Sequence, residues 1–274
     1  MIKLRKAERQ KSKIRLGLSG ASGFGKTYSA LKIAKGLVGD WGKIALIDTE
    51  NGSGDLYSDL GDYNIITLQS PYSPERYIEC VKACEDAGME CIIIDSITHE
   101  WDGDGGCLDI QTKLGGRYQD WAKVTPRHNS FVNSLLSSTA HIITTVRRKQ
   151  DYDMVKEGNR TVVKKVGTKE VTREGFEYEL TINLEIVNDE HLVKSSKDRT
   201  GLFMNLPEFI PTEETGELIR NWCESGVEVI TPETRLRESK TLQELASNWD
   251  AMNAKEKDAN LQVKDELKQQ LKTA

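Results

Sequence analysis

The stretch from Gly20 to Thr27 constrains the fold most strongly, because its glycines and closing Lys-Thr pair match the phosphate-binding pattern G-x-x-x-x-G-K-[ST]. An apolar run over 14–19 precedes it and predicts a short strand, and residues 26–38 predict a helix. A strand, a glycine turn and a helix in this order direct backbone N–H groups and a helix N-terminus at an anion. The stretch therefore predicts a nucleotide site, whereas an incidental glycine turn would not explain the flanking elements.

The loop also supplies the side chains that a phosphate site requires. Lys26 can reach the β- and γ-phosphates, and the Thr27 hydroxyl can bind Mg²⁺. We expect ATP and Mg²⁺ as ligands, with the nucleotide held by Gly20, Ala21, Ser22, Gly23, Phe24, Gly25, Lys26, Thr27 and Tyr28.

The chain up to about residue 150 alternates between strand and helix patterns. Strands are expected at 14–19, 43–48, 90–95 and 140–146, and helices at 26–38, 74–87 and 119–138. The runs at 43–48 and 90–95 are almost entirely apolar, which is typical of parallel strands that are covered on both faces. The pattern predicts an α/β fold with a doubly wound, mainly parallel sheet. Long connections at about 49–73 and 97–118 are expected to carry the functional site, as such loops commonly do.

The pattern changes after residue 150. Residues 151–175 are polar, and an alternating strand at 178–186 can pair with 191–194 as a late β-hairpin. Near the end, Thr241 and Glu244 have the spacing of a helix capping box. We therefore predict a basic N-terminal arm or helix at 1–13, a nucleotide-binding core at 14–228 and a helical C-terminal tail at 229–274.

The composition excludes some classes of protein. The 274 residues are 37% hydrophobic and 30% charged, and no run approaches the roughly 18 apolar residues of a membrane span. The charged N-terminus lacks an apolar signal region, so we expect a cytoplasmic protein without a membrane partner. Cys80 and Cys84 are four residues apart without a second ligand pair, which favours core thiols over a zinc site.

A carboxylate at the end of a neighbouring strand is needed for Mg²⁺, and Asp95 follows the apolar run at 91–94. Asp95 and Thr27 are thus the predicted metal ligands. Many ATPases place a glutamate after this aspartate to activate water, but here that residue is Ser96. Glu50, which follows the strand at 43–48, is the leading candidate for the catalytic base, and Glu100 is the alternative.

A polar side chain at the tip of the next strand can sense the γ-phosphate. Thr144 and Thr145 occupy that position, after the apolar residues 142–143. Successive strand residues point to opposite faces, so only one of the two threonines is expected to face the nucleotide.

Taken together, these residues resemble the RecA-type recombinase core over roughly residues 14–200. Ile47-Asp48-Thr49-Glu50 matches the family element whose glutamate activates water, and Ile92-Ile93-Ile94-Asp95-Ser96 matches its metal-binding strand. The chain is more closely similar to phage-encoded RecA-like ATPases, some of which anneal single strands. The stretches that carry this closer similarity are 3–9, 72–77, 121–126, 173–179 and 196–203.

The resemblance implies properties that the composition does not show. It implies a RecA-like P-loop NTPase that assembles into a ring or filament with ATP between subunits. Cations that would reach a neighbour's γ-phosphate are Lys194, Lys197 and Arg199. Single-stranded DNA would contact loops at about 102–118 and 148–175, through Lys113, Arg117, Arg147, Arg148, Lys149, Lys156, Arg160, Lys164 and Lys165, with Tyr118 and Tyr152 as stacking groups.

Departures from the family pattern narrow the expected function. The sensor is a threonine rather than an amide, and the large C-terminal domain of full recombinases is not evident. ATP-gated DNA binding or single-strand annealing is therefore favoured over strand exchange, in the host cytoplasm if the chain is phage-encoded. A single-strand-binding protein is a further partner that this role allows.

The net charge of −5 and the helical tail favour an alternative function. In it, the chain is an ATPase switch or loader that acts on a protein partner in phage replication or defence.

Overall fold

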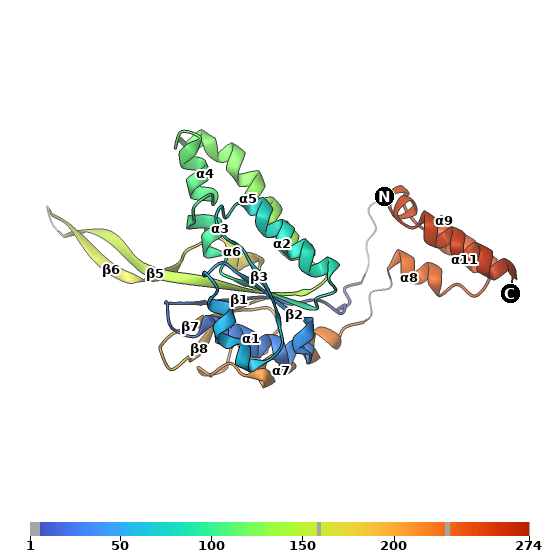
Figure 1. The fold of residues 1–274 in the computed structure, drawn as a ribbon, viewed down its shortest axis with the longest axis horizontal. Helices are drawn as coiled ribbons and strands as arrows, with labels where there is room; N and C mark the ends of the chain where they lie inside the picture. The colour runs from blue at the N-terminus through green and yellow to red at the C-terminus, as the bar shows by residue number, and fades with distance from the viewer. Residues whose placement is uncertain (1–5, 158–159, 228–230, 274) are drawn as a thin grey trace. The chain divides into compact units, whose positions relative to one another are not determined.

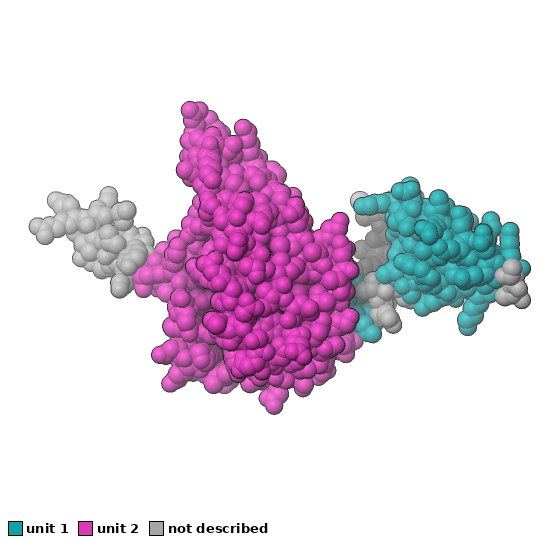
Figure 2. All heavy atoms as spheres, viewed as in Figure 1, with its two compact units in different colours: residues 1–11, 225–274 teal, residues 12–224 magenta. Residues whose placement is uncertain are grey.

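The structure is a computed structural model that describes residues 6–157, 160–227 and 231–273, with side chains described for these residues except 152–166 and 273. The chain divides into two compact units, Ser12–Glu224 and a second one of Met1–Lys11 with Ser225–Ala274 (Figure 2). The sequence prediction placed the boundaries after residues 13 and 228. None of the helices in the described parts of the chain is both long and apolar enough to cross a membrane.

The larger unit is built on one mainly parallel sheet. Its strands lie in the order β3 (Asn64–Thr67), β2 (Ile44–Asp48), β4 (Cys91–Asp95), β5 (His141–Glu157), β1 (Arg15–Gly20), β7 (Ile182–Ile186) and β8 (Val193–Asp198), and β6 (Arg160–Glu170) pairs with β5. All pairings are parallel except β7 with β8 and β5 with β6. The predicted fold class is confirmed, and the β7–β8 pair is the predicted late hairpin.

Helices cover both faces of this sheet (Figure 1). Helices α1 (Lys26–Val38) and α7 (Glu213–Glu224) pack on one face, and α2 (Pro74–Asp86) and α5 (Trp121–Ser137) pack on the other. Neighbouring residues of β4 alternate between the two layers, with Ile93 in the α1 layer and Ile92 and Ile94 in the α2 layer. This double coverage explains why the central strands are continuous apolar runs.

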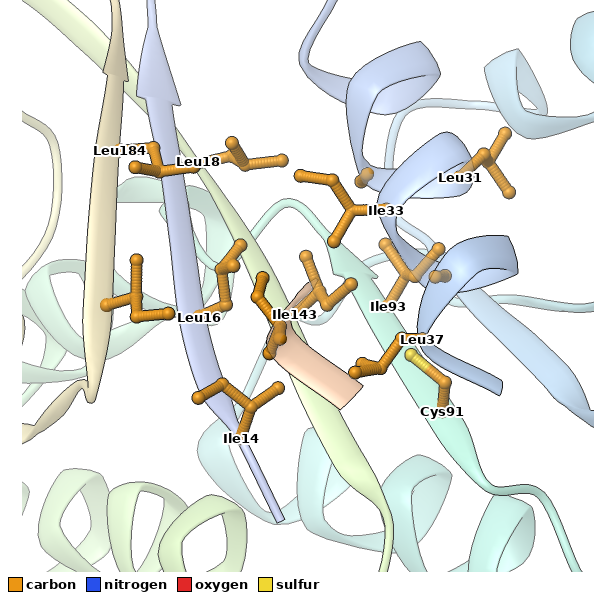
Figure 3. Packing of buried hydrophobic residues seen from close by; sticks show 14 of the residues in the cluster. Ile14, Leu16, Leu18, Leu31, Ile33, Leu37, Cys91, Ile93, Ile143 and Leu184 are labelled. Carbon is orange, nitrogen blue, oxygen red and sulfur yellow. The ribbon is translucent and has the colours of Figure 1, made fainter. Parts of the chain in front are cut away.

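The α1 layer forms a dense apolar core (Figure 3). Leu16 and Leu18 of β1 and Ile33 of α1 are all fully buried. Full burial of such a side chain stabilises the fold by about 1.5–3 kcal/mol. This layer therefore anchors β1 and α1, the two elements that flank the phosphate-binding loop.

Two predicted connections contain more structure than expected. The 49–73 connection holds a 3-10 helix (Ser53–Leu60) and the edge strand β3, and the 97–118 connection holds α3 (Thr98–Asp102) and α4 (Cys107–Lys113). Strand β3 was missed because it has only four residues, which are exposed or half-buried, and so lacks an apolar run. The strand predicted at 178–186 begins at Ile182, and the short helix α6 (Phe176–Glu179) precedes it.

The prediction of a loop at about 148–175 was wrong for most of that range. Strand β5 continues to Glu157 and pairs with β6 in antiparallel register from Arg148↔Glu170 to Glu157↔Arg160. The parallel neighbours of β5 end earlier, since β4 pairs only to Thr144 and β1 only to Arg147. The segment after Arg147 is thus a two-stranded ribbon, and its sequence has no long apolar run like those of the central strands to reveal it.

The smaller unit contains the helices α8 (Pro232–Arg237), α9 (Leu242–Asp250), α10 (Ala254–Ala259) and α11 (Leu261–Thr273). Leu236, Leu245 and Met252 form its buried core. The Thr241 side chain caps α9 by accepting from the N–H of Glu244, but the Glu244 carboxylate accepts from Lys240 rather than from Thr241. Residues 6–13 are not helical, and Gln10 forms an isolated parallel bridge with Val227.

Candidate active site

The carboxyl ends of the central strands bring the predicted site residues to one edge of the sheet. Asp48 of β2 lies beside Asp95 of β4, and Gly20 of β1 lies beside Arg147 of β5. Because all four strands are parallel, the chain segments that leave them emerge at this same edge. The sheet therefore gathers the phosphate loop, both acidic segments and the base of the ribbon in one place.

Left-handed glycines shape the phosphate loop. Gly23 and Gly25 have φ angles of 82° and 83°, and Gly25 is the N-cap of α1. A Cβ on Gly25 would lie 2.7 Å from Nδ1 of His191, so a side chain there meets both strain and a clash. The loop thus depends on glycine to direct its N–H groups and the N-terminus of α1 into the site.

Lys26 folds back over the loop. Its Nζ donates to the carbonyl oxygens of Gly20 at 3.2 Å and of Ala21 at 2.8 Å. Burial lowers the pKa of the Lys26 ammonium, and the nearby Asp95 and Glu50 carboxylates oppose that shift. An ammonium held at the loop without a direct carboxylate contact is well placed to pair with phosphate oxygens.

Asp95 is the centre of the predicted metal site. It is 3% exposed, and its two carboxylate oxygens accept from the hydroxyls of Thr27 and Thr145, each at 2.5 Å. Burial raises the pKa of Asp95, while the two hydroxyl groups oppose the shift. The structure thus brings Thr27 and Asp95 together, as predicted. A carboxylate beside a hydroxyl at a phosphate loop is a donor set that suits Mg²⁺.

Glu50 faces this site but is engaged by Arg147. The guanidinium donates to both Glu50 oxygens, and the Nε contact to Oε1 is 2.9 Å. Ser96 Oγ donates to the same Oε1 at 3.2 Å. The Asp48 carboxylate holds the backbone after β2 by accepting from the N–H of Glu50 at 2.6 Å. The candidate base is therefore held in a defined position by charge pairing.

These groups line a cavity of about 460 Å³, large enough for a small-molecule ligand. Its walls include Lys26, Thr27, Glu50, Asp95 and Arg147. Tyr28, Tyr57 and His191 line it too, and the His191 Nδ1 hydrogen-bonds to the carbonyl of Phe24 at 2.9 Å. The Nδ1 atom donates in this contact, since a carbonyl can only accept.

Two predicted site residues lie elsewhere. Thr144 faces the opposite side of the sheet, where its hydroxyl donates to the carbonyl of Leu16 at 3.4 Å, so Thr145 is the threonine that reaches the site. Glu100 does not line the nucleotide cavity and is fully buried against His128 and Cys107. The alternation of side chains along β5 and the turn into α3 account for these two placements.

The predicted trans-acting cations do not line the nucleotide cavity of their own chain. Lys197 and Arg199 both donate to the carbonyl of Tyr178, and Lys197 also donates to that of Glu177 at 2.8 Å. Lys194 is exposed on β8, opposite Glu185.

Most predicted DNA contacts whose side chains are described are already paired with acids. Lys113 pairs with Asp109 at 2.6 Å, Lys149 pairs with Asp102 at 2.7 Å, and Arg148 pairs with Glu170 and Glu185. Arg147 belongs to the nucleotide cavity through Glu50, and Arg117 is exposed. The side chains of Tyr152, Lys156, Arg160, Lys164 and Lys165 lie outside the described residues.

Sequence reasoning missed four contributors to the cavity. His191 comes from the β7–β8 turn, Ser53 and Tyr57 come from the 3-10 helix after β2, and Arg147 was assigned only to DNA. Arg147 was detectable, because it follows the sensor threonines at the end of an apolar strand. Ser53, Tyr57 and His191 belong to no recognised motif and carried no comparable signal.

A family model of the AAA domain matches residues 12–208. The chain belongs to this family. The match covers the sheet from β1 to β8 and every residue of the cavity described above. This AAA domain is therefore a nucleotide-dependent P-loop ATPase. No curated protein matches the chain.

Proposed function

We propose that this AAA-type protein hydrolyses ATP with Mg²⁺, binds single-stranded DNA and promotes single-strand annealing in recombination. Support for the hydrolytic part comes from the cavity. The phosphate loop and Lys26 would hold the triphosphate, and Thr27 and Asp95 would hold Mg²⁺, which supplies charge neutralisation at the phosphates.

Glu50 is the proposed general base. It lies in the cavity with Lys26 and Asp95, and it is the only glutamate among the described residues that line it. A water between Glu50 and the terminal phosphate would give its proton to the carboxylate as its oxygen attacks phosphorus, and the bond from that phosphorus to the bridging oxygen of ADP would break. Arg147 donates to both carboxylate oxygens, so this water would compete with Arg147 for Glu50. Phosphate oxygens are a competing acceptor for that guanidinium.

The observation that carries the proposed link to DNA is the position of Arg147. It pairs with the candidate base on one side, and it is the last β5 residue that pairs with β1 before the ribbon begins. A nucleotide that draws Arg147 from Glu50 would therefore pull on the base of the ribbon. Conversely, DNA on the ribbon would change the position of Arg147.

A hollow beside the ribbon is the site that we propose for a single strand. It measures about 1230 Å³, and its lining includes Lys149, Lys169 and Lys197, the rings of Trp101 and Tyr178, and the acidic residues Asp102, Asp151, Glu170, Glu174, Glu177 and Glu185. Cations and aromatic rings in one groove are the features that bind single strands without sequence preference. Lys149 is 65% exposed in its ion pair with Asp102, and exposed pairs contribute at most about 1 kcal/mol, so a phosphate can replace the carboxylate.

Self-assembly is part of the same proposal. Lys194, Lys197 and Arg199 would serve the cavity of a neighbouring copy in a ring or filament, and a single-strand-binding protein is a plausible further partner at the DNA. Their position on and after β8, outside the cavity of their own chain, is compatible with such a role. We expect this work to take place in the cytoplasm, that of the host if the chain is phage-encoded.

The direct test is steady-state ATP hydrolysis with Mg²⁺, with and without single-stranded DNA, at low and moderate salt. We expect DNA to stimulate hydrolysis and its binding to weaken steeply with salt, as for any ligand bound through phosphates. Annealing of complementary strands is followed in the same solutions, with Lys26→Ala as the control in which nucleotide binding is weakened.

The DNA proposal is contradicted if the rate of ATP hydrolysis is the same with and without DNA and no salt-sensitive DNA binding is found. That result favours the second candidate, an ATPase switch or loader for a protein partner in phage replication or defence. The net charge of −5 and the separate helical unit with its own core are the observations that support this candidate.

A further inference from the structure

A second polar cluster lies within the larger unit, away from the nucleotide cavity. Glu100 of α3, Cys107 of α4 and His128 of α5 place one carboxylate oxygen, one sulfur and one ring nitrogen within 4.8 Å of one another. Their exposed fractions are 0%, 0% and 4%. Three potential metal ligands from three helices thus meet in a space that water hardly reaches.

The contacts within this cluster are short and converge on one carboxylate. His128 Nδ1 lies 3.0 Å from Oε1 and 3.1 Å from Oε2 of Glu100, and Cys107 Sγ lies 3.1 Å from Oε1. Ligand atoms on a tetrahedral zinc ion are separated by about 3.3–3.6 Å, given bonds of about 2.0–2.3 Å. The two separations from Oε1, to Nδ1 and to Sγ, are therefore within a few tenths of an ångström of these values, and all three atoms lie within 4.8 Å of one another.

The charge of Glu100 has little compensation in the protein. Among the described residues, no lysine or arginine forms an ion pair with it, and its side-chain partners are His128 and Cys107. An isolated buried carboxylate is costly unless it is paired or bound to a metal. A divalent ion with one carboxylate, one thiolate and one neutral imidazole makes the cluster electrically neutral.

A tight turn between α3 and α4 brings Cys107 close to Glu100. Cβ atoms on Gly103 and Gly106 would lie 2.5 and 2.6 Å from the carbonyl oxygen of His99, so only glycine permits the turn that returns Cys107 to Glu100. Trp101 meets the His128 ring edge-on at 5.7 Å and stacks on Trp121 at 5.5 Å. These rings fix the imidazole and exclude solvent.

We propose that Glu100, Cys107 and His128 bind a zinc ion that links their three helices. Thiolate and imidazole ligands select zinc over Mg²⁺, so the site is chemically distinct from the nucleotide site. The ion joins α3, α4 and α5 directly behind β4, whose last residue is Asp95. It thereby stiffens the segment whose Thr98 hydroxyl accepts from the N–H of Arg147 at 3.0 Å.

The test measures metal in the full chain, expressed without a polyhistidine tag and purified without chelator. We expect about one zinc per chain by elemental mass spectrometry. Cys107→Ser and His128→Gln should each lower zinc content at least tenfold. Cys84→Ser and His141→Asn are the matched controls, because both residues are buried outside the cluster, and they should keep the metal.

A second measurement covers the case in which the ligand variants fail to fold. Wild-type chain is stripped with a chelator and titrated with Co²⁺, which should produce thiolate-to-cobalt charge-transfer absorption and raise the Tm by roughly 5–10 °C. Zinc retained by Cys107→Ser overturns the assignment. Neither zinc in the wild type nor a cobalt–thiolate band means that the cluster is a metal-free hydrogen-bonded triad.

Discussion

Glu50 and Glu100 each follow an apolar strand of the same sheet, β2 and β4, and each was a candidate for the catalytic base. Glu50 lies in the nucleotide cavity, with Arg147 and Ser96 on its carboxylate. Glu100 is enclosed by three helices, with His128 and Cys107 on its carboxylate. Both carboxylates are held firmly, but only one is open to a substrate.

The difference shows how burial assigns roles to chemically identical groups. An accessible carboxylate paired with a mobile cation can exchange that partner for water or phosphate, whereas a fully enclosed carboxylate can only serve the fold or a metal. Position after a strand therefore does not distinguish a base from a structural ligand. The following predictions test the comparison, beginning with the largest expected effect.

Glu50→Gln should lower the ATP turnover number by roughly 10²–10⁴-fold while ATP binding persists, because an amide cannot accept the proton from water. Glu100→Gln should change turnover by less than tenfold and instead lower the free energy of unfolding by about 1–3 kcal/mol, since it removes charge from a buried network. Single-turnover hydrolysis and urea unfolding measure the two effects. Normal turnover in Glu50→Gln with loss in Glu100→Gln would reverse the assignment.

Lys26→Ala should weaken ATP affinity by roughly 10- to 100-fold, as expected when bonds to a charged phosphate worth about 1.5–3 kcal/mol are lost. Its unfolding should remain close to that of the wild type, which separates this edge of the sheet from the buried cluster. Fluorescent-nucleotide titration measures the affinity. Unchanged affinity would sink the assignment of the phosphate loop.

Arg147→Gln should reduce DNA stimulation of hydrolysis by roughly fivefold or more, because the proposed link between the ribbon and Glu50 is removed. The matched control is Arg148→Gln, since Arg148 is adjacent but pairs with Glu170 and Glu185 rather than with the base. Stimulation is measured with saturating DNA. Equal losses in both variants would show that general charge on the ribbon matters more than the Glu50 pair.

A pH series distinguishes His128 from the other buried histidine, His141. Burial lowers the pKa of His141 to about 3, and its Nδ1 accepts from the N–H of Ile14 at 3.1 Å. The unfolded chain, with a histidine pKa near 6.5, binds the proton first, so stability is present above about pH 6.5 and is lost as pH falls toward 3. His141 contributes at most about 1.4 kcal/mol per pH unit to the slope of the free energy of unfolding against pH.

His141→Asn keeps an acceptor for Ile14 and should flatten this slope in urea unfolding between pH 4 and 6.5. A slope that is unchanged in His141→Asn but flattened in His128→Gln would move the effect to the Glu100 cluster.

Much of the nucleotide site was predictable because its residues are adjacent in sequence or end an apolar strand. The phosphate loop and Asp95 belong to local patterns, and parallel strands bring such ends together by rule. The ribbon was not predictable as strands, because its sequence is mostly polar and lacks the apolar runs of the central strands. Choosing Thr145 over Thr144 required the register of β5, because a shift of one residue would exchange the faces to which the two side chains point.

The sequence by itself determined the α/β class, and it predicted the phosphate loop, the candidate metal carboxylate and the preference for Glu50, because each rests on local periodicity or fixed spacing. The tertiary structure alone decided which threonine faces Asp95, that Arg147 holds Glu50, and that His191 reaches the loop across a distance of more than 160 residues in the chain. It also brought together Glu100, Cys107 and His128, whose spacings match no metal motif. Such contacts depend on how helices pack around the sheet, and packing joins residues whose separation along the chain carries no signal.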